Sequence, residues 1–387
     1  MVEQPTFLPT LPNRLPDEWY PSFIYRLHLL GGLPTVERSV LAIFGQPLNL
    51  SHFAPTGVAE LAKRIPPSYG LNTETFLAEN TIFPYLRPFA FKNTPSEFQH
   101  NFVHDSPRAT KNYLLPGRRA GLGKREPRFC VSCMSDDTEQ WGFPYFHRSH
   151  QVPEVVVCVR HGVPLRSSCL ECGSFAWPPY RLWPAGSCRR CGADLQAQGS
   201  DPSVVFTNIL ADLRIAQLIT QFLDANLPLL DVATLHATYR VALKRNDFLT
   251  SRNALKVGEF AAAVSERFGD GYLEELGLPV KISSIFTPRW AALILSKTPS
   301  VRPLEHCLAI FFLFGSFDNF IEEYQNSGRL QEPPLSVPPE LTSYSETKES
   351  THAWMRSAEI PVPIVRRKSD SPGNRDDLED LRACRYT

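Results

Sequence analysis

The chain has 387 residues, which predicts two or three domains, and 43% of them are hydrophobic, enough to bury a sizeable core. The 40 Lys and Arg residues balance the 40 Asp and Glu residues, which excludes a polycation that coats nucleic acid by bulk charge and leaves only a local basic patch for that role. No apolar run approaches the roughly 20 residues that cross a bilayer, and no basic-then-apolar signal opens the chain, so we expect a soluble, intracellular protein with no membrane partner.

The first part of the chain, 1–115, predicts a small helical domain after a proline-rich arm. Apolar residues recur there at helical spacing, and a Gly-Gly pair ends the first helix. Such a domain either contacts DNA as a helix-turn-helix-like fold or serves only for packing. The helices expected are 17–32, 35–44, 58–65 and 73–81.

A basic loop, 116–128, follows, with five cations against the single acid Glu126. It predicts either a loop that contacts DNA phosphates or a solvated basic linker. A nucleotide-binding P-loop is excluded, because Gly117 lies one residue too far from Gly123 and Arg125 stands where Ser or Thr would bind magnesium. The cations are Arg118, Arg119, Lys124, Arg125 and Arg128, of which the first four are our candidate DNA contacts.

Seven of the nine cysteines lie between Cys130 and Cys191, mostly in pairs separated by two residues. Zinc binds four such ligands in a tetrahedron, and each C-x2-C pair supplies two of them from one tight turn. Together with one histidine they form two sets of four candidate metal ligands, Cys130, Cys133, Cys158 and His161, then Cys169, Cys172, Cys188 and Cys191.

This spacing predicts that 116–200 is a tandem zinc-ribbon region that binds two structural Zn²⁺ ions. Both ligand sets are complete, whereas a catalytic zinc keeps one position open. A disulfide framework is the weaker interpretation, because the cluster has an odd number of cysteines and no signal peptide precedes it. Sequential pairing of the ligands is favoured over an interleaved cross-brace.

Four further polar residues accompany the predicted zinc sites. We expect His147 and His150 to orient ligands or backbone from outside the metal sites, although one of them replacing a ligand or contacting a partner stays open. The adjacent acids Asp136 and Asp137 are expected to be solvated.

Periodic apolar residues predict a second helical domain over 201–330. Its helices are expected over 208–223, 234–245 and 256–268. The last two resemble a helix-turn-helix, but their link is longer than the usual turn of about 3–4 residues, so a plain helical hairpin is the alternative. The candidate DNA contacts here are Arg240, Lys244, Arg245 and Arg252.

The adjacent His306 and Cys307 do not form a catalytic pair, because neighbouring residues on a helix do not face each other. The apolar residues that follow them predict core. Residues 331–387 are rich in Pro, Ser and charged residues without apolar periodicity, and predict a disordered tail.

The cysteine region resembles the TniQ/TnsD family of transposon target-selection proteins. Residues 129–173 contain, in order, a C-x2-C pair, the sequence YFHRSHQVPEV, the sequence VCVRHG and another C-x2-C pair. Segments 15–32, 239–277 and 301–320 add a less specific likeness, so the resemblance covers about 10–325.

The resemblance implies a non-catalytic protein that reads target DNA and recruits an AAA+ ATPase (TnsC-like) that loads the transposase. It also implies that some members dock on RNA-guided CRISPR effector complexes, that homodimers occur, and that the location is the bacterial cytoplasm, near the nucleoid.

We therefore interpret the chain as a mostly α, multi-domain protein with a central irregular, small-β zinc-ribbon region, acting as a DNA-targeting adaptor. One alternative is a protein-only scaffold, which suits the zero net charge and the absence of a further large domain after about 325. A zinc-dependent nuclease or transposase is the other, but the H-E-x-x-H motif that would indicate an open metal site is absent.

Overall fold

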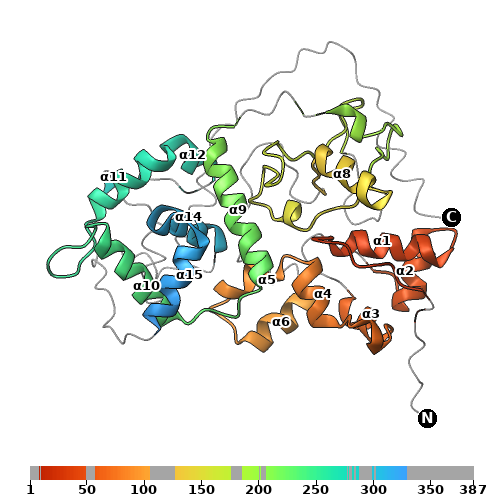
Figure 1. Cartoon of the computed structure of the whole chain (residues 1–387), viewed down its shortest axis with the longest axis horizontal. Coiled ribbons are helices and arrows are strands. Elements are labelled where there is room, and N and C mark those ends of the chain that lie inside the picture. Colours follow the sequence, from red (N-terminus) through yellow and green to blue (C-terminus); the bar gives the residue numbers. More distant parts are fainter. Residues whose placement is uncertain are drawn as a thin grey trace. The chain divides into compact units, whose positions relative to one another are not determined.

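The computed structural model describes residues 10–48, 57–104, 127–175, 185–199, 206–276 and 302–328, together with Leu8, Asp201, Leu278, Pro299 and two short strands. All of them belong to the first of two units into which the chain divides, 1–342; the second unit, 343–387, and the rest of the predicted tail lie outside the described residues. The described residues are mostly helical with a central region of short irregular segments, which confirms the predicted fold class (Figure 1). The domain boundaries stay predictions.

Several N-terminal helices begin or end at residues that cap them. The side chains of Thr35 and Asn72 accept hydrogen bonds from backbone N–H groups in the first turns of the second and fourth helices, and Gly32 ends the first helix in the left-handed conformation. The α-helices are α1 (Tyr20–Gly31), α2 (Val36–Phe44), α3 (Val58–Lys63), α4 (Thr73–Asn80), α5 (Phe83–Leu86) and α6 (Pro95–His104), with 3₁₀ turns η1 (Pro67–Tyr69) and η2 (Arg87–Phe89).

Helices α5 and α6 were not predicted. Helix α5 is only one turn long and has no periodicity to detect. Helix α6 does carry a signal, because Thr94 and Glu97 form a reciprocal capping box: the Thr94 N–H donates to the Glu97 carboxylate at 2.8 Å and the Glu97 N–H donates to the Thr94 hydroxyl at 3.3 Å.

Among its described residues, 127–175 and 185–199, the central region contains one α-helix, α8 (Val131–Trp141), and the 3₁₀ turns η3 (Ser149–Gln151) and η4 (Gln196–Gln198). Its strand-like pairings are isolated bridges, such as Val157 with Pro164 and Ser187 with Asp194. The sequence pattern suggested a turn at Cys130 and Cys133; instead Cys130 is the N-cap of α8 and Cys133 lies in its first turn.

The C-terminal helices are α9 (Ile209–Ala225), α10 (Val232–Arg245), α11 (Val257–Phe268), α12 (Asp270–Glu275), α14 (Pro303–Phe314) and α15 (Phe317–Ser327), with antiparallel strands β1 (Lys281–Ile282) and β2 (Ile285–Phe286). The link between α10 and α11 is a small hairpin in which Leu249 pairs with Leu255. Helix α10 packs against α14 and α15, and α11 packs against α12 and β2. This link differs from the short turn of a helix-turn-helix.

None of the described helices is by itself long and apolar enough to cross a membrane; α14 and α15 reach that length and composition only as a pair, with a 90° bend between them.

One buried core contains residues from all three regions of the chain. Phe89 packs edge-to-face on Phe222 of α9 at 5.3 Å between ring centroids and stacks on His306 of α14 at 4.5 Å. The Tyr239 hydroxyl lies 2.8 Å from Nδ1 of His306. Cys307 is fully buried, and burial raises the pKa of its thiol. Both His306 and Cys307 are therefore core residues, like the neighbouring Leu308, Ala309 and Ile310 for which the sequence predicted core.

A buried arginine joins the three regions. The guanidinium of Arg148 donates to Asp17 at 3.0 Å, to the carbonyl oxygen of Ala78 in α4, and to Asp224 at 3.2 Å near the end of α9. The Arg148 N–H also donates to the Asp17 carbonyl at 2.7 Å. A guanidinium holds its five donors in one rigid plane, so its contacts fix three chain segments together.

The backbone conformation and the carboxylate of Asp17 both suit its contact with Arg148. Its φ of +53° is a left-handed conformation that Asp tolerates better than most residues. Its carboxylate also accepts hydrogen bonds from the Ser149 hydroxyl and backbone N–H. Burial alone would raise the pKa of Asp17, but the hydrogen bond with His147 and the charge of Arg148 outweigh burial and hold that pKa well below its usual range.

We predict that Arg148→Met lowers the free energy of unfolding by about 3 kcal/mol, because it leaves a carboxylate and a carbonyl of the joint without their buried partner. Urea unfolding of the full chain measures this difference. Arg38→Met, at an exposed position of α2, should change the same free energy by less than about 0.5 kcal/mol. Equal effects of the two substitutions would contradict the conclusion that Arg148 holds the three chain segments together.

Candidate metal centres

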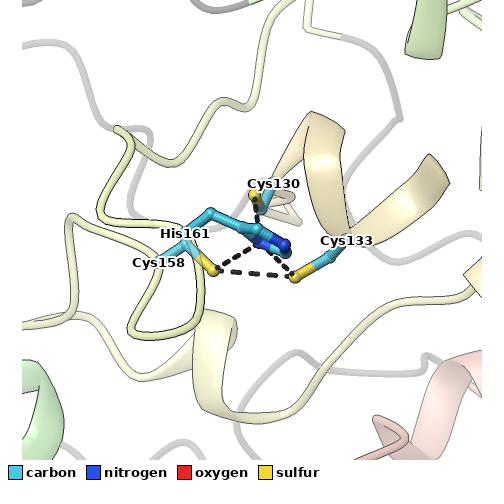
Figure 2. Close-up of side chains that lie close together, drawn as sticks. All are labelled: Cys130, Cys133, Cys158 and His161. Atoms are coloured by element: carbon cyan, nitrogen blue, oxygen red, sulfur yellow. Dashed lines mark hydrogen bonds between the residues drawn. The ribbon is translucent and has the colours of Figure 1, made fainter. Parts of the chain in front are cut away.

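The first candidate metal centre brings together four ligand atoms from two short segments (Figure 2). Nδ1 of His161 lies 3.5 Å from the sulfur of Cys130, 3.4 Å from that of Cys133 and 3.5 Å from that of Cys158. The sulfurs of Cys133 and Cys158 are 3.6 Å apart. The N-cap and first turn of helix α8 supply the first two cysteines, and a turn closed by a hydrogen bond from Gly162 N–H to the Cys158 carbonyl supplies the other two ligands.

These separations fit a tetrahedral zinc site. Zn–S bonds of about 2.3 Å and Zn–N bonds of about 2.0 Å at tetrahedral angles place sulfurs about 3.8 Å apart and sulfur and nitrogen about 3.5 Å apart. A disulfide would need sulfurs about 2.05 Å apart, and the eight cysteines in the described part of the chain are all free. The donor set and its spacing therefore suit a metal ion better than a disulfide.

The second candidate centre is made of two C-x2-C turns. The sulfurs of Cys169 and Cys191 lie 3.7 Å apart, as do those of Cys172 and Cys188. In each turn the residue after the second cysteine is a left-handed glycine, Gly173 or Gly192, whose N–H donates to the carbonyl of the first cysteine. Only glycine adopts that conformation without strain, which explains its place in both turns.

Both sets of ligands follow the order of the chain, without the interleaving of a cross-brace. Each site is complete with four protein ligands, an arrangement typical of structural rather than catalytic zinc.

The two centres differ in burial. Cys130, Cys133 and Cys158 lie in the large core that also contains α9 and α14. The second centre belongs to a smaller apolar cluster with residues such as Trp19 and Met134. It is also more open to solvent, since one of its ligands, Cys191, is exposed.

The two additional histidines lie outside both ligand sets. His147 is held between Asp137, at 2.9 Å, and Asp17, at 3.5 Å. Burial lowers the pKa of His147, but hydrogen bonds with both aspartates outweigh burial and raise the pKa to about 9. His150 has Nε2 4.0 Å from the sulfur of Cys133, and burial lowers its pKa to about 3. The first ring is therefore charged and the second neutral at pH 7.

Two polar side chains beside the second centre were not singled out from the sequence. The Gln198 amide nitrogen donates to the sulfur of Cys169 at 3.1 Å, and its amide oxygen accepts hydrogen bonds from Arg166 at 2.7 Å and from the Leu170 N–H at 2.9 Å. The spacing of cysteines gives no signal for Gln198, because this residue lies 29 positions from the sulfur it contacts.

The first group of candidate DNA contacts, Arg118, Arg119, Lys124 and Arg125, lies outside the described residues. Arg128, the last cation of that basic loop, is buried and donates to the carbonyl oxygens of Val152 and Val155. Arg128 is therefore a structural residue and not part of a DNA-contacting loop.

The second group lies on or near α10. Lys244, Arg245 and Arg252 are exposed, and Arg240 is half-buried. Arg245 forms an ion pair with Glu323 of α15 at 3.3 Å. Arg240 and Lys244 are four residues apart and therefore lie on the same side of the helix.

Two family models match the chain. The TniQ model matches residues 9–165, a range that includes the first candidate metal centre. The model described as Tn7-like transposition protein D (TnsD) matches residues 215–348. The second candidate metal centre lies between the two matched ranges. A search of curated proteins found no match.

We predict that the purified chain contains two metal ions and that Cys133→Ser and Cys191→Ser each remove one of them. Cys133 is buried in the large core, so its substitution should also lower the melting temperature more than substitution of the exposed Cys191, whose centre belongs to the smaller cluster. Mass spectrometry of bound metal and thermal unfolding measure the two effects. Full metal content in Cys133→Ser would contradict the assignment of the first centre.

We also predict a stability that depends on His147 ionisation. The His147 pKa is about 9 in the folded chain against 6.5 for the ordinary side chain, so its stabilising effect is complete below pH 6.5 and is lost as the pH rises to about 9. Relative to His147→Gln, the native chain should lose on the order of 2 kcal/mol of unfolding free energy over that interval. Urea unfolding of both proteins at several pH values measures this difference. Cysteine thiols also titrate in this pH range, but they are present in both proteins, so their effect cancels in the comparison. A difference that does not change with pH would refute it.

Proposed function

The chain belongs to the TniQ/TnsD family and is a Tn7-like transposition target-selection protein, and we propose that it acts as a non-catalytic adaptor. In this proposal the chain binds target DNA, or a complex that has found the target, and recruits an AAA+ ATPase that regulates the transposase. The family membership carries the proposal. The ligand sets support its non-catalytic part, because both are complete and leave no position for a substrate.

We assign both metal centres to structural Zn²⁺. Thiolate and imidazole ligands at tetrahedral spacing favour zinc over hard cations such as Mg²⁺ and Ca²⁺. A bound zinc crosslinks its ligand turns and contributes on the order of 10 kcal/mol to folding. In the first centre this crosslink fixes α8 to the turn between Cys158 and His161.

The arrangement of the chain supports an adaptor. Arg148 connects the turn after α8 to Asp17 and to Asp224 at the end of α9, so the range matched by TniQ and the range matched by TnsD are held together by contacts of this buried arginine as well as by a common core. A protein that couples target recognition to ATPase recruitment needs such a connection between its binding surfaces.

For direct DNA contact we propose the exposed cations Lys244 and Arg252 with Arg240 and Arg245, together with the basic loop residues Arg118, Arg119, Lys124 and Arg125. Lysine and arginine side chains at exposed positions contact phosphates and fix the position of a protein on the duplex.

A protein-only scaffold is a second candidate function. It is favoured by the zero net charge of the chain and by the burial of Arg128. Arg245 also already has an acidic partner, Glu323. In that case the chain docks on a targeting complex, such as an RNA-guided effector, and another component contacts the DNA.

The two functions are separated by measuring binding of the full-length protein to duplex DNA and to its AAA+ ATPase, each alone and together. An adaptor that reads DNA binds the duplex with a strong dependence on salt and brings the ATPase to it. A protein-only scaffold binds the ATPase without binding the duplex. Failure to bind either one would sink both proposals.

We predict that Lys244→Ala combined with Arg252→Ala weakens DNA binding for all sequences and reduces the slope of log affinity against log salt by about two, since each phosphate contact contributes about one. Fluorescence anisotropy across a salt series measures this slope. Arg214→Ala is the matched control, because Arg214 is an exposed arginine on α9 outside the proposed contacts. An equal loss in the control would show a general charge effect instead of a contact.

A further inference from the structure

We propose that Asp136 is the positioning residue of the first metal centre, through a hydrogen bond that fixes the tautomer and orientation of the ligand His161. The inference rests on the assignment of that centre as a metal site. It adds a side chain that the C-x2-C and C-x2-H spacing does not reveal.

The geometry that carries the proposal is a contact on each ring nitrogen of His161. Nδ1 faces the three cysteine sulfurs at 3.4–3.5 Å. Nε2, on the other side of the ring, lies 3.1 Å from Oδ2 of Asp136. A neutral imidazole has one N–H and one lone pair. With the N–H on Nε2 donating to the carboxylate, the lone pair on Nδ1 is directed at the metal position.

Asp136 reaches this place because of its register on α8. It lies three residues after the ligand Cys133, so the two side chains project from neighbouring positions on one side of the helix. The carboxylate therefore connects α8, which supplies two ligands, to the turn that supplies the other two. That connection is independent of the ion and orients His161 before the ion binds.

The charge around Asp136 is balanced by Arg160. A guanidinium nitrogen of Arg160 lies 2.9 Å from the same Oδ2 that accepts from His161. Three thiolates around a divalent cation leave one net negative charge, to which the Asp136 carboxylate adds another. The cation of Arg160 offsets this addition and keeps the carboxylate beside the imidazole.

The neighbouring acid Asp137 has a different role. Successive helix residues point in directions about 100° apart, and Asp137 is buried against His147 at 2.9 Å. The sequence pattern suggested that both acids were solvated; for Asp137 this was wrong. Of these two acids, only Asp136 contacts a metal ligand, and this distinguishes a positioning role from a general effect of acidic charge.

The experiment compares Asp136→Ala, Asp136→Asn and the control Glu139→Gln in the full-length chain. Glu139 is an exposed acid on the same helix. Loss of a side chain that orients a metal ligand commonly weakens metal affinity by about 10- to 100-fold. We expect Asp136→Ala to weaken zinc binding at the first centre by at least about tenfold in chelator competition. The zinc affinity of the second centre should be unchanged.

Asp136→Asn keeps an acceptor for the Nε2 proton, so its zinc affinity at the first centre should fall between those of Asp136→Ala and the native chain.

A second set of measurements reports how the His161 ring is oriented and where it carries its proton. In nitrogen-15 NMR spectra of the imidazole rings, the native chain should show His161 protonated at Nε2 alone, and Asp136→Asn should preserve that tautomer. Cobalt substitution reports the ligand field, and Asp136→Ala should alter the visible absorption of cobalt at the first centre. Both readouts are independent of DNA binding.

The outcomes that overturn the proposal are distinct. If Asp136→Ala binds zinc at the first centre within twofold of Glu139→Gln, Asp136 does not position the ligand. If Asp136→Ala and Asp136→Asn lose both metals equally, Asp136 stabilises the fold in general. If the native chain holds no ion at the first centre, the metal assignment itself fails, and the adaptor function is still testable by DNA and ATPase binding.

Discussion

Three cysteine sulfurs and a ring nitrogen converge in the first metal centre, all within 4.8 Å of one another and with the three cysteines buried. As thiolates the three cysteines would repel one another strongly at that separation, so a cation bound between them would stabilise the arrangement. The same cysteines pack in the large core with residues of α1, α5, α9 and α14. Under the proposed zinc assignment, the packing around these cysteines depends on the balance between their charge and that of the ion.

From this centre a series of polar contacts leads to both helical regions. His150 lies against the sulfur of Cys133, and the rings of His150 and His147 are 5.0 Å apart. His147 in turn contacts Asp17, which also receives Arg148. Buried polar groups are costly unless each has a partner, so these groups hold one another in a single arrangement. The contacts of Arg148 that join the two family-matched ranges are thus connected, through these side chains, to the first metal centre.

Much of the fold and of the site could be predicted from local sequence, and the rest could not for a physical reason. Candidate ligands such as Cys169 and Cys172 were identifiable because metal coordination imposes a short fixed spacing. Long amphipathic helices such as α9 were identifiable because burial imposes a period of 3.6 residues. The contact of Arg148 with Asp17, in contrast, joins residues 131 positions apart, and no local pattern encodes such a pair. Likewise, Asp136 and Asp137 are chemically identical, and only the register of α8 gives them different partners.

The second metal centre sits in its own small apolar cluster, with one ligand exposed, and between the two family-matched stretches of sequence. Its cluster is shared with Trp19 and with Met134 of α8, and it does not include the cysteines of the first centre. Because this centre lies outside the large core, its turns are a part of the described structure where a substitution would disturb few residues of that core.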